Sequence, residues 1–259
     1  MIIKVKKHFG QNFLIDESVK DKIIQAIPND DNLNIVEIGA GLGDLTKRLL
    51  QKFSVIAYEV DKDLIEHLKC AFKSEIEDGK FLLHEGDVLE FWSNNVSLNS
   101  SCYQLIANIP YNISTPILTN ALTDYNCKNM IVMVQKEFAN KLNAKALSSD
   151  FSPISVLAGI VGNVEVLFDV YPTSFEPQPK VVSSIVRIKK NEQKIDFRKL
   201  QKYLKVAFLA PRKKLQKNLL NGFDKKLVFS IFEELDIDSN LRPHELSHNS
   251  HFRLFNKLN

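Results

Sequence analysis

The sequence predicts an α/β fold in which a mostly parallel sheet carries helices on both faces, followed by a small all-helical C-terminal domain. Strand and helix patterns alternate along residues 1–190. A turn with glycine at every second position, from Gly39 to Gly43, follows the first apolar strand. After Lys190 only helical patterns remain. Strands that alternate with helices form βαβ units, whose right-handed connections produce a doubly wound sheet.

Each element is predicted from its local pattern. Short apolar runs between turns indicate strands at residues 34–38, 54–59, 80–84, 103–107, 130–135, 163–168 and 181–188. Apolar residues spaced three or four apart indicate helices at residues 44–52, 62–73, 116–124, 137–146, 197–209, 212–221, 227–235 and 248–258. We therefore expect two domains, residues 1–190 and residues 191–259.

The composition is that of a soluble globular protein. Of the 259 residues, 44% are hydrophobic and 25% are charged, which excludes disorder as the main state. The three cysteines, Cys70, Cys102 and Cys127, are odd in number and show no C-x-x-C spacing. This usage argues against a disulfide framework and against a zinc site, so we expect no metal.

No segment of the sequence indicates export or membrane insertion. Lys4, Lys6 and Lys7 interrupt the N-terminus before a signal-peptide core could form. The longest nearly uncharged apolar stretch, Ile154 to Gly162, is far shorter than the roughly 20 residues of a membrane helix. We expect a cytoplasmic protein without membrane association.

The charge is unevenly distributed. The chain has 34 basic and 31 acidic residues, a net charge of +3. Residues 189–226 contain thirteen Lys and Arg and three acids, a net of +10, which leaves −7 for the rest. An acidic body with a basic module is a common design for a polyanion partner. A solvated, Lys-rich helical face would explain the charge equally well.

The glycine-rich turn between residues 37 and 44 has the chemistry of a ligand-binding loop. Glycines let the backbone bend sharply and approach a ligand at a helix N-terminus. The dinucleotide pattern G-x-G-x-x-G would need glycine at position 44, where Asp44 stands. The turn therefore favours a nucleoside ligand without a pyrophosphate over NAD, although a tight connection without any ligand remains an alternative.

Two acids follow the next predicted strands. Glu59 ends the second strand, where a carboxylate can accept hydrogen bonds from both ribose hydroxyls of an adenosine. Asp87 follows the third strand and could accept a hydrogen bond from an adenine amino group. One such acid usually caps a loop. Two of them in register with a glycine loop are better explained by a ligand in the crevice at this sheet edge.

The segment Asn108-Ile109-Pro110-Tyr111 predicts amine chemistry at the end of the fourth strand. An aromatic exocyclic amine is a poor nucleophile because its lone pair is delocalised into the ring. Acceptance of its two N–H groups by the Asn108 side-chain oxygen and the Ile109 carbonyl would favour a tetrahedral, nucleophilic nitrogen. Pro110 would fix the backbone, and Tyr111 would stack on the base in line with a methyl donor. A turn that merely caps the strand is the alternative.

These motifs, together with others along the chain, resemble the small-subunit ribosomal RNA adenine N6,N6-dimethyltransferase family over nearly the whole length. The matching segments are residues 8–14, 36–43, 59–61, 86–88, 108–114, 135–137 and 174–181. The sequence departs from the family pattern at residues 151–155, where Tyr-Gly-x-Leu-Ser is usual. It departs again at Pro211-Arg212, where Lys213 follows instead of a second arginine.

The resemblance implies a Rossmann-like S-adenosylmethionine-dependent methyltransferase sheet and a role in ribosome biogenesis. The implied reaction dimethylates two adjacent adenines in a hairpin loop near the 3′ end of 16S rRNA. The implied partner is small-subunit rRNA in a pre-ribosomal 30S particle, which a monomer would bind through its basic C-terminal domain.

The resemblance also assigns site residues. The implied cofactor-binding residues are Asn12, Leu14, Gly39, Gly41, Glu59, Asp87 and Asn108. Asn12 and Leu14 would close over the cofactor. The implied catalytic residues are Asn108, Tyr111 and Phe175, with Phe175 facing Tyr111 across the target base. Without the resemblance, Phe175 would be read as a loop residue packed onto the core.

Two alternatives remain. The related 23S rRNA dimethyltransferases of the macrolide-resistance type share the Asn-Ile-Pro-Tyr motif, but the matches at residues 212–215 and 242–247 favour the small-subunit type. A non-catalytic RNA-binding assembly factor could keep the same fold. The intact Gly39, Glu59, Asp87, Asn108 and Tyr111 argue against that loss of activity.

Overall fold

The structure is a computed structural model that describes residues 6, 10–28, 33–92, 96–192 and 194–259. The chain divides into two compact units. Unit 1 comprises Met1–Ala139 and Glu165–Lys190, and unit 2 comprises Asn140–Val164 and Asn191–Asn259. Residues 140–164, which the sequence analysis assigns to the first domain, thus belong to the second unit.

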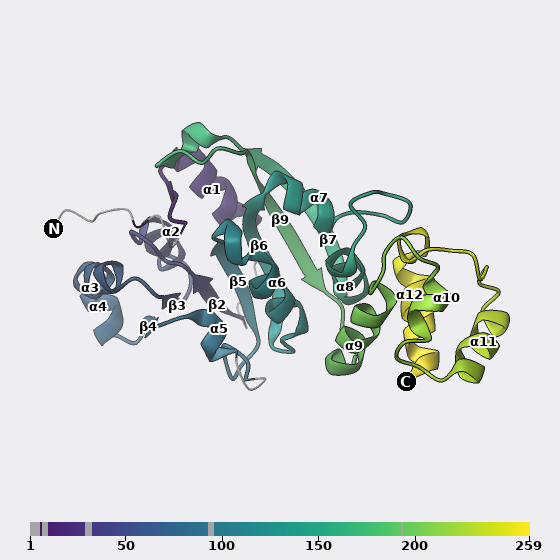
Figure 1. The fold of residues 1–259 in the computed structure, drawn as a ribbon. Coiled ribbons are helices and arrows are strands. Elements are labelled where there is room, and N and C mark those ends of the chain that lie inside the picture. Colours follow the sequence, from purple (N-terminus) through teal and green to yellow (C-terminus); the bar gives the residue numbers. More distant parts are fainter. Residues whose placement is uncertain (1–5, 7–9, 29–32, 93–95, 193) are drawn as a thin grey trace. The chain divides into compact units, whose positions relative to one another are not determined.

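A seven-stranded sheet organises unit 1 (Figure 1). Its strands are β2 (Asn34–Ile38), β3 (Val55–Glu59), β4 (Phe81–Glu85), β5 (Tyr103–Asn108), β6 (Cys127–Gln135), β7 (Gly162–Val170) and β9 (Ser183–Lys190). Their order is β4-β3-β2-β5-β6-β9-β7. The first five are parallel and β9 runs antiparallel to β6. The seven predicted strands are confirmed, and so is the α/β class.

The register of the sheet aligns the strand ends that carry the predicted site. Ile38 of β2 lies opposite Tyr58 of β3 and Ala107 of β5. The next residue of each strand, Gly39, Glu59 and Asn108, therefore reaches the same level of one sheet edge. In a parallel sheet this carboxyl edge is where ligands bind.

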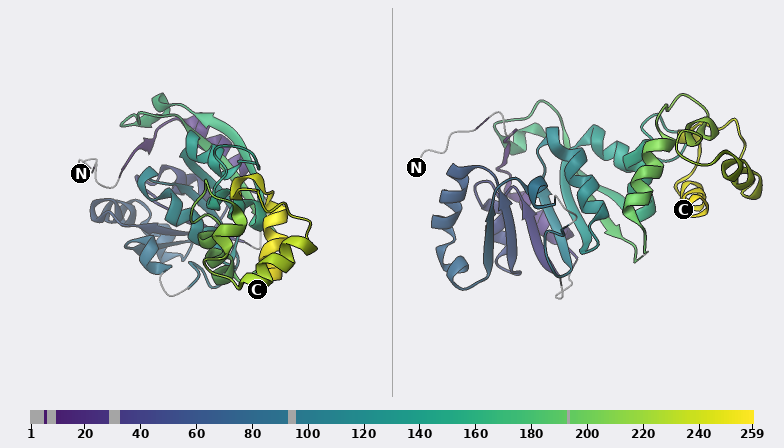
Figure 2. Two further views of the ribbon diagram at one scale, coloured as in Figure 1. Left: turned by 45° about the vertical axis from the view of Figure 1, so that its right-hand side comes forward. Right: turned by 60° about the horizontal axis from the view of Figure 1, so that its bottom comes forward.

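Helices cover both faces of the sheet (Figure 2). Helices α1 (Glu17–Ala26), α2 (Asp44–Leu49) and α3 (Lys62–Ala71) share one apolar cluster with β2 to β6. Helix α6 (Ser114–Thr123) packs on β6, and its Ile117, Leu118, Ala121 and Leu122 are fully buried. Strands buried on both faces explain the continuous apolar runs in the sequence.

Short elements complete unit 1. Helices α4 (Lys73–Glu77) and α5 (Val88–Phe91) flank β4, and α7 (Lys136–Leu142) begins directly after β6. A separate two-stranded sheet joins β1 (Phe13–Leu14) to β8 (Phe175–Glu176) in antiparallel pairing. This pairing fixes the N-terminal segment against a part of the chain about 160 residues later.

Unit 2 is built from helices. They are α8 (Pro153–Val161), α9 (Phe197–Ala207), α10 (Leu215–Leu219), α11 (Lys225–Glu234) and α12 (His248–Leu258). Helix α8 packs against α9 and α12, and most of its residues are buried. A helix that is apolar on all sides is stable only when other elements cover those sides. Because α9 and α12 cover α8, residues 140–164 belong to this unit. Among the helices described, none is long and apolar enough to cross a membrane.

His251 lies at the centre of unit 2 with no exposed surface. The Pro243 carbonyl, 2.8 Å from Nε2, can only accept, so Nε2 carries the proton. Nδ1 then accepts a hydrogen bond from the Tyr203 hydroxyl at 2.7 Å. Burial lowers the pKa of His251 to about 4, so this ring is neutral at physiological pH.

Candidate active site

A cavity of about 240 Å³, open to solvent, lies at the carboxyl edge of the sheet in unit 1. Seven of the nine predicted site residues line it: Asn12, Gly39, Gly41, Glu59, Asp87, Asn108 and Tyr111. They come from the N-terminal segment and from the ends of four neighbouring parallel strands. Segments far apart in the sequence thus meet in one cleft, as the strand-end pattern predicts.

The glycine loop has the backbone conformation that only glycine adopts readily. Gly39, Gly41 and Gly43 have φ angles of 73°, 58° and 83°. At Gly43 a Cβ atom would also lie 2.5 Å from the Phe72 ring. The loop therefore packs closely on α3 on one side while Gly39 and Gly41 present backbone to the cavity.

Glu59 ties the glycine loop to β3. Its Oε2 accepts a hydrogen bond from the Gly41 N–H at 3.0 Å. Its Oε1 accepts from the N–H groups of Val60 at 2.9 Å and Asp61 at 3.0 Å. The residue is only 5% exposed, and burial raises its pKa although the three N–H donors oppose that shift. A carboxylate offers about four acceptor positions, so about one remains for a ligand.

Asp87 is exposed and lies at the N-terminus of α5, where its Oδ1 accepts from the Leu89 N–H at 2.9 Å. The side chain is thus a helix cap as well as a cavity residue. Because the carboxylate is exposed, it has acceptor capacity left for a ligand.

Asn108 ends β5 and reaches across the cavity to the N-terminal segment. Its Nδ2 donates a hydrogen bond to the Asn12 carbonyl at 3.1 Å. The Asn12 side chain donates to the Gly10 carbonyl at 3.2 Å, within its own turn. This contact joins the side-chain amide of Asn108, which the sequence analysis singles out, to the backbone of the N-terminal segment.

The turn after Asn108 is fixed by hydrogen bonds. The Pro110 carbonyl accepts from the Ile113 N–H at 3.1 Å and from the Ser114 hydroxyl at 3.2 Å. The Tyr111 hydroxyl lies 2.7 Å from the hydroxyl of Ser183, the first residue of β9. Burial of this half-buried ring raises the pKa of Tyr111. Both ends of the tyrosine side chain are therefore held, and its ring lines the cavity.

Phe175 and Leu14 are not among the residues that line this cavity. Phe175 is only 2% exposed and belongs to the hydrophobic core, so its position across the target base from Tyr111 stays a prediction. Strand alternation explains the burial, because the next residue, Glu176, is exposed. Leu14 lies opposite Phe175 in the β1–β8 pair and lines a smaller second cavity beside the glycine loop.

Gln11, which lines the cavity, and its hydrogen-bond partner Asp61 are not singled out by the sequence analysis. Gln11 lines the cavity and its Nε2 donates to Asp61 Oδ2 at 2.7 Å. Both residues fall within motifs of the family, residues 8–14 and 59–61, and that was the only available signal. Lys4, Lys7, His8 and Phe9 lie outside the described residues. In the described part of the chain, His, Cys, Asp and Glu side chains form no group of three suited to a metal ion.

Glu37 lies behind the glycine loop and lines the smaller cavity. It is 2% exposed, and its Oε2 accepts a hydrogen bond from the Thr46 hydroxyl at 2.6 Å. Burial raises the pKa of Glu37 to about 7, and the nearby Glu59 adds to the shift. Below pH 7 this carboxyl is mostly neutral, so β2 and α2 then pack without a buried charge.

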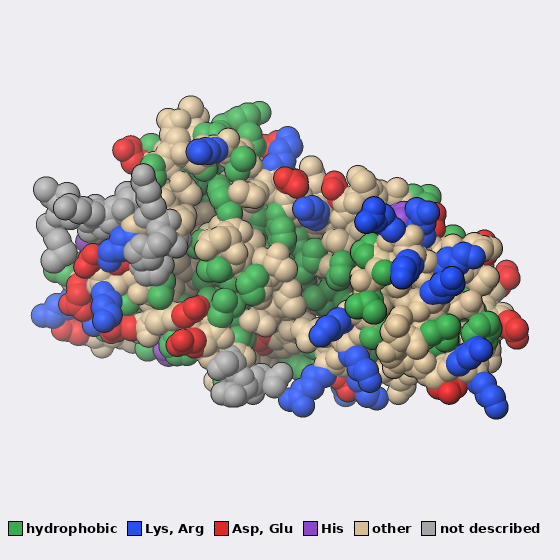
Figure 3. All heavy atoms as spheres, in the orientation of Figure 1, with side chains coloured by type: hydrophobic (Ala, Val, Ile, Leu, Met, Phe, Trp, Pro, Cys, Tyr) green, Lys and Arg blue, Asp and Glu red, His purple; other side chains and the backbone are tan. Residues whose placement is uncertain are grey.

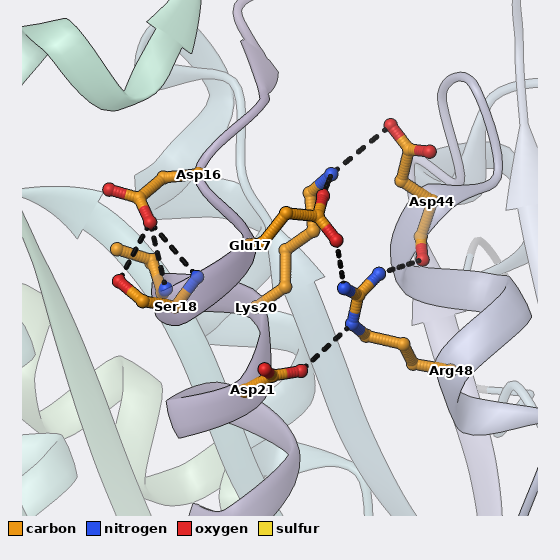
Figure 4. Close-up of polar contacts among 8 residues, drawn as sticks. Asp16, Glu17, Ser18, Lys20, Asp21, Asp44 and Arg48 are labelled. Atoms are coloured by element: carbon orange, nitrogen blue, oxygen red, sulfur yellow. Dashed lines mark hydrogen bonds and ion pairs between the residues drawn. The ribbon is translucent and has the colours of Figure 1, made fainter.

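Ion pairs join α1 to α2, the helix that follows the glycine loop (Figure 4). Arg48 of α2 pairs with Glu17 and, at 3.1 Å, with Asp21 of α1. The Lys20 ammonium, on a side chain only 3% exposed, lies 2.8 Å from Glu17 and 3.4 Å from Asp44. These pairs hold α2, and with it the C-terminal end of the glycine loop, against α1.

Comparison with known proteins gives the family. The family model described as "Ribosomal RNA adenine dimethylase" matches residues 2–259. A protein of Campylobacter hominis named "Ribosomal RNA small subunit methyltransferase A" is 48% identical over 260 residues, which cover 98% of this chain and 96% of that protein. A protein of the same name from Aliarcobacter butzleri is 47% identical over 99% of this chain and 97% of its own.

Solved structures agree with the fold. A dimethyladenosine transferase from Plasmodium falciparum superposes with a TM-score of 0.79 at 28% identity, over 95% of this chain and 98% of that one. The 23S rRNA methyltransferase ErmE superposes with a TM-score of 0.71 at 22% identity, over 95% and 99%. The second likeness is to the fold alone.

Proposed function

This chain belongs to the ribosomal RNA adenine dimethylase family, and on that premise we propose that it methylates two adjacent adenines near the 3′ end of small-subunit rRNA. The reaction uses S-adenosylmethionine and gives N6,N6-dimethyladenine at both bases. One observation carries the proposal: a single cavity brings together the glycine loop, Glu59, Asp87 and the Asn108–Tyr111 turn. The relatives that share nearly half of the residues are named small-subunit methyltransferases, which favours 16S over 23S rRNA.

The cavity suits the adenosine part of S-adenosylmethionine. Glu59 is held by three backbone N–H groups and keeps about one acceptor position. We therefore assign one ribose hydroxyl to Glu59. This role is narrower than the sequence prediction, in which Glu59 accepts from both ribose hydroxyls. Asp87, exposed at the next strand end, is assigned to the adenine amino group. Bound there, the cofactor supplies an electrophilic methyl group on a positively charged sulfur.

The Asn108–Tyr111 turn prepares the nucleophile. The Asn108 Oδ1 and the Ile109 carbonyl accept the two N–H groups of the target adenine, which draws the nitrogen lone pair out of the ring. The Pro110 carbonyl is already engaged by two donors, so Ile109 provides the second acceptor. The nitrogen then bonds to the methyl carbon as the carbon–sulfur bond breaks, and its proton leaves to solvent. We assign no general base.

Tyr111 holds the base. A base flipped out of RNA loses its stacking neighbours, and an aromatic face replaces them at about 1–3 kcal/mol. The hydrogen bond to Ser183 fixes the tyrosine ring, so the angle at which the base stacks is fixed as well.

Unit 2 supplies the contact to the RNA backbone. Eleven exposed basic residues lie on α9, α10, α11 and the loops beside them: Lys194, Arg198, Lys199, Lys202, Lys205, Arg212, Lys213, Lys214, Lys217, Lys225 and Lys226. Figure 3 shows Lys and Arg side chains gathered over these helices. Lys190, which the sequence analysis counts with them, belongs to unit 1, and its ammonium donates to the Ala121 and Asp124 carbonyls. We propose that the protein acts as a cytoplasmic monomer on a pre-ribosomal 30S particle.

The test uses purified protein, methyl-labelled S-adenosylmethionine and 30S and 50S subunits from cells that lack the modification. Nucleoside mass spectrometry and primer extension locate the product. We expect four methyl groups in two adjacent adenines of 16S rRNA. Label in 23S rRNA would favour the macrolide-resistance activity, and RNA binding without label would favour an assembly factor.

A further inference from the structure

We propose that Gln11 and Asp61 are positioning residues for the target amine, a role that rests on the proposed function. They hold the Asn12 carbonyl against the Asn108 amide and so decide which atom of that amide meets the substrate. Neither residue touches the reacting atoms in this assignment.

The Asn12 carbonyl fixes the orientation of the Asn108 side-chain amide. A backbone carbonyl can only accept a hydrogen bond, so the amide group 3.1 Å from the Asn12 carbonyl must be the NH₂. This contact leaves Oδ1 as the atom available to the substrate. If the amide turned over, an NH₂ group would meet the amine of adenine, and two donors would oppose each other. The Asn12 carbonyl therefore selects the productive orientation.

Asn12 is held in place by its neighbours on both sides in the chain. On one side, its neighbour Phe13 pairs with Glu176 in the β1–β8 sheet. On the other side, its neighbour Gln11 is held at both ends of its amide. Gln11 Oε1 accepts from the Lys6 N–H at 2.7 Å, and Nε2 donates to Asp61 Oδ2 at 2.7 Å.

Asp61, the hydrogen-bond partner of Gln11, is itself fixed in the fold. Asp61 is 1% exposed and caps α3 by accepting from the Asp63 N–H at 3.0 Å. It lies two residues beyond Glu59, at the rigid junction of β3 and α3. The path from Asp61 through Gln11 and Asn12 to Asn108 thus links the end of β3 to the end of β5 across the cavity.

Asp63 provides a matched control. Its carboxylate lies 2.7 Å from the Lys6 ammonium, which also pairs with Asp61. Among the described contacts, however, Asp63 has no hydrogen bond to Gln11. The side chain is 56% exposed. Asp63→Asn therefore removes charge next to Asp61 and Lys6 but leaves the Gln11 contact in place.

The experiment measures single-turnover methylation of 30S subunits at saturating S-adenosylmethionine and RNA. Gln11→Ala and Asp61→Asn should lower this rate by about tenfold, since each removes a hydrogen bond that involves a charged group. Asp61→Asn retains a good helix cap. Asp63→Asn should stay within about twofold of the wild type. Affinity for S-adenosylhomocysteine, measured by calorimetry, should fall by less than the rate does in both positioning variants.

A double-mutant cycle separates positioning from general damage. If Gln11 acts through Asn108, Gln11→Ala causes no further loss of rate in the Asn108→Ala background. Equal losses in both backgrounds would overturn the proposal, as would wild-type rates in the single variants. A wild-type protein that methylates no 16S rRNA would refute the proposed function instead, so the two failures are distinct.

Discussion

The two units place their polar groups in opposite ways. Unit 1 buries Glu37 and Glu59 beside the cavity and bends its backbone through three glycines of positive φ. Unit 2 buries one histidine among helices and carries eleven exposed cations on α9, α10, α11 and the loops beside them. A parallel sheet aligns rigid strand ends, which suits chemistry that needs fixed geometry. Helices display long charged side chains, which suits a partner recognised by its phosphates.

The sharpest test of fixed geometry in unit 1 is Asn108→Asp, which changes one NH₂ to oxygen. The new carboxylate would face the Asn12 carbonyl, and two acceptors cannot share a hydrogen bond. We expect the single-turnover rate to fall about 10²–10³-fold, as when a preorganised group of an active site is removed. A rate within tenfold of the wild type would show that the polarity of this amide is unimportant.

The buried ionisable groups should give the two units opposite pH dependence. In unit 2 the pKa of His251 is lowered from 6.5 to about 4. Above pH 6.5 both folded and unfolded states are neutral, and below it the unfolded state binds the proton first. The stability of unit 2 should therefore fall by roughly 3 kcal/mol between pH 6.5 and pH 4. Hydrogen exchange of α9 and α12 amides measures this loss, and His251→Gln should abolish most of it.

In unit 1 the pKa of Glu37 is raised from 4.5 to about 7. The folded state therefore keeps the proton that the unfolded state releases above pH 4.5. This stabilisation is complete below pH 4.5, and up to roughly 3 kcal/mol of it is lost as the pH rises through 7. Denaturant unfolding of Glu37→Gln should show a shallower pH dependence than the wild type over that range. Parallel curves for the two proteins would contradict the assignment.

Cofactor affinity should depend on unit 1 through Glu59. Glu59→Ala removes the ribose acceptor and three backbone hydrogen bonds, so the affinity for S-adenosylmethionine should fall by about 1.5–3 kcal/mol. Calorimetry of Asp87→Ala in parallel shows whether the buried Glu59 or the exposed Asp87 contributes more to the cofactor affinity. Unchanged affinity in Glu59→Ala would remove the ribose assignment.

The smallest expected effect tests the tyrosine anchor. Tyr111→Phe and Ser183→Ala each delete one side of the same hydrogen bond. Each should raise the activation free energy of the single turnover by about 0.5–1.5 kcal/mol, the value of one neutral hydrogen bond. Similar losses in both variants would show that the bond holds the ring. A loss in Tyr111→Phe alone would mean that the hydroxyl has another role.

Local signals were enough to predict the strand ends and most of the residues that line the cavity. The seven strands, the glycine loop, Glu59, Asp87 and Asn108 are each visible within a few neighbouring residues. The features that local signals do not predict depend on distant contacts. Helix α8 joins unit 2 because Gly159 allows the His248 ring to pack where a Cβ would lie within 2.6 Å. Phe175 is buried by pairing with β1, about 160 residues earlier, and Gln11 meets Asp61 across 50 residues.

The division of work between the units can be measured in one protein, Arg212→Glu with Lys213→Glu and Lys214→Glu. All three side chains are exposed in unit 2. The affinities for S-adenosylhomocysteine and for 30S subunits are measured on the same preparation at several salt concentrations. We expect an unchanged cofactor affinity and an RNA affinity that is at least about tenfold weaker, with a shallower salt dependence because fewer counterions are released. Unchanged RNA binding, or an equal loss for both ligands, would contradict the account.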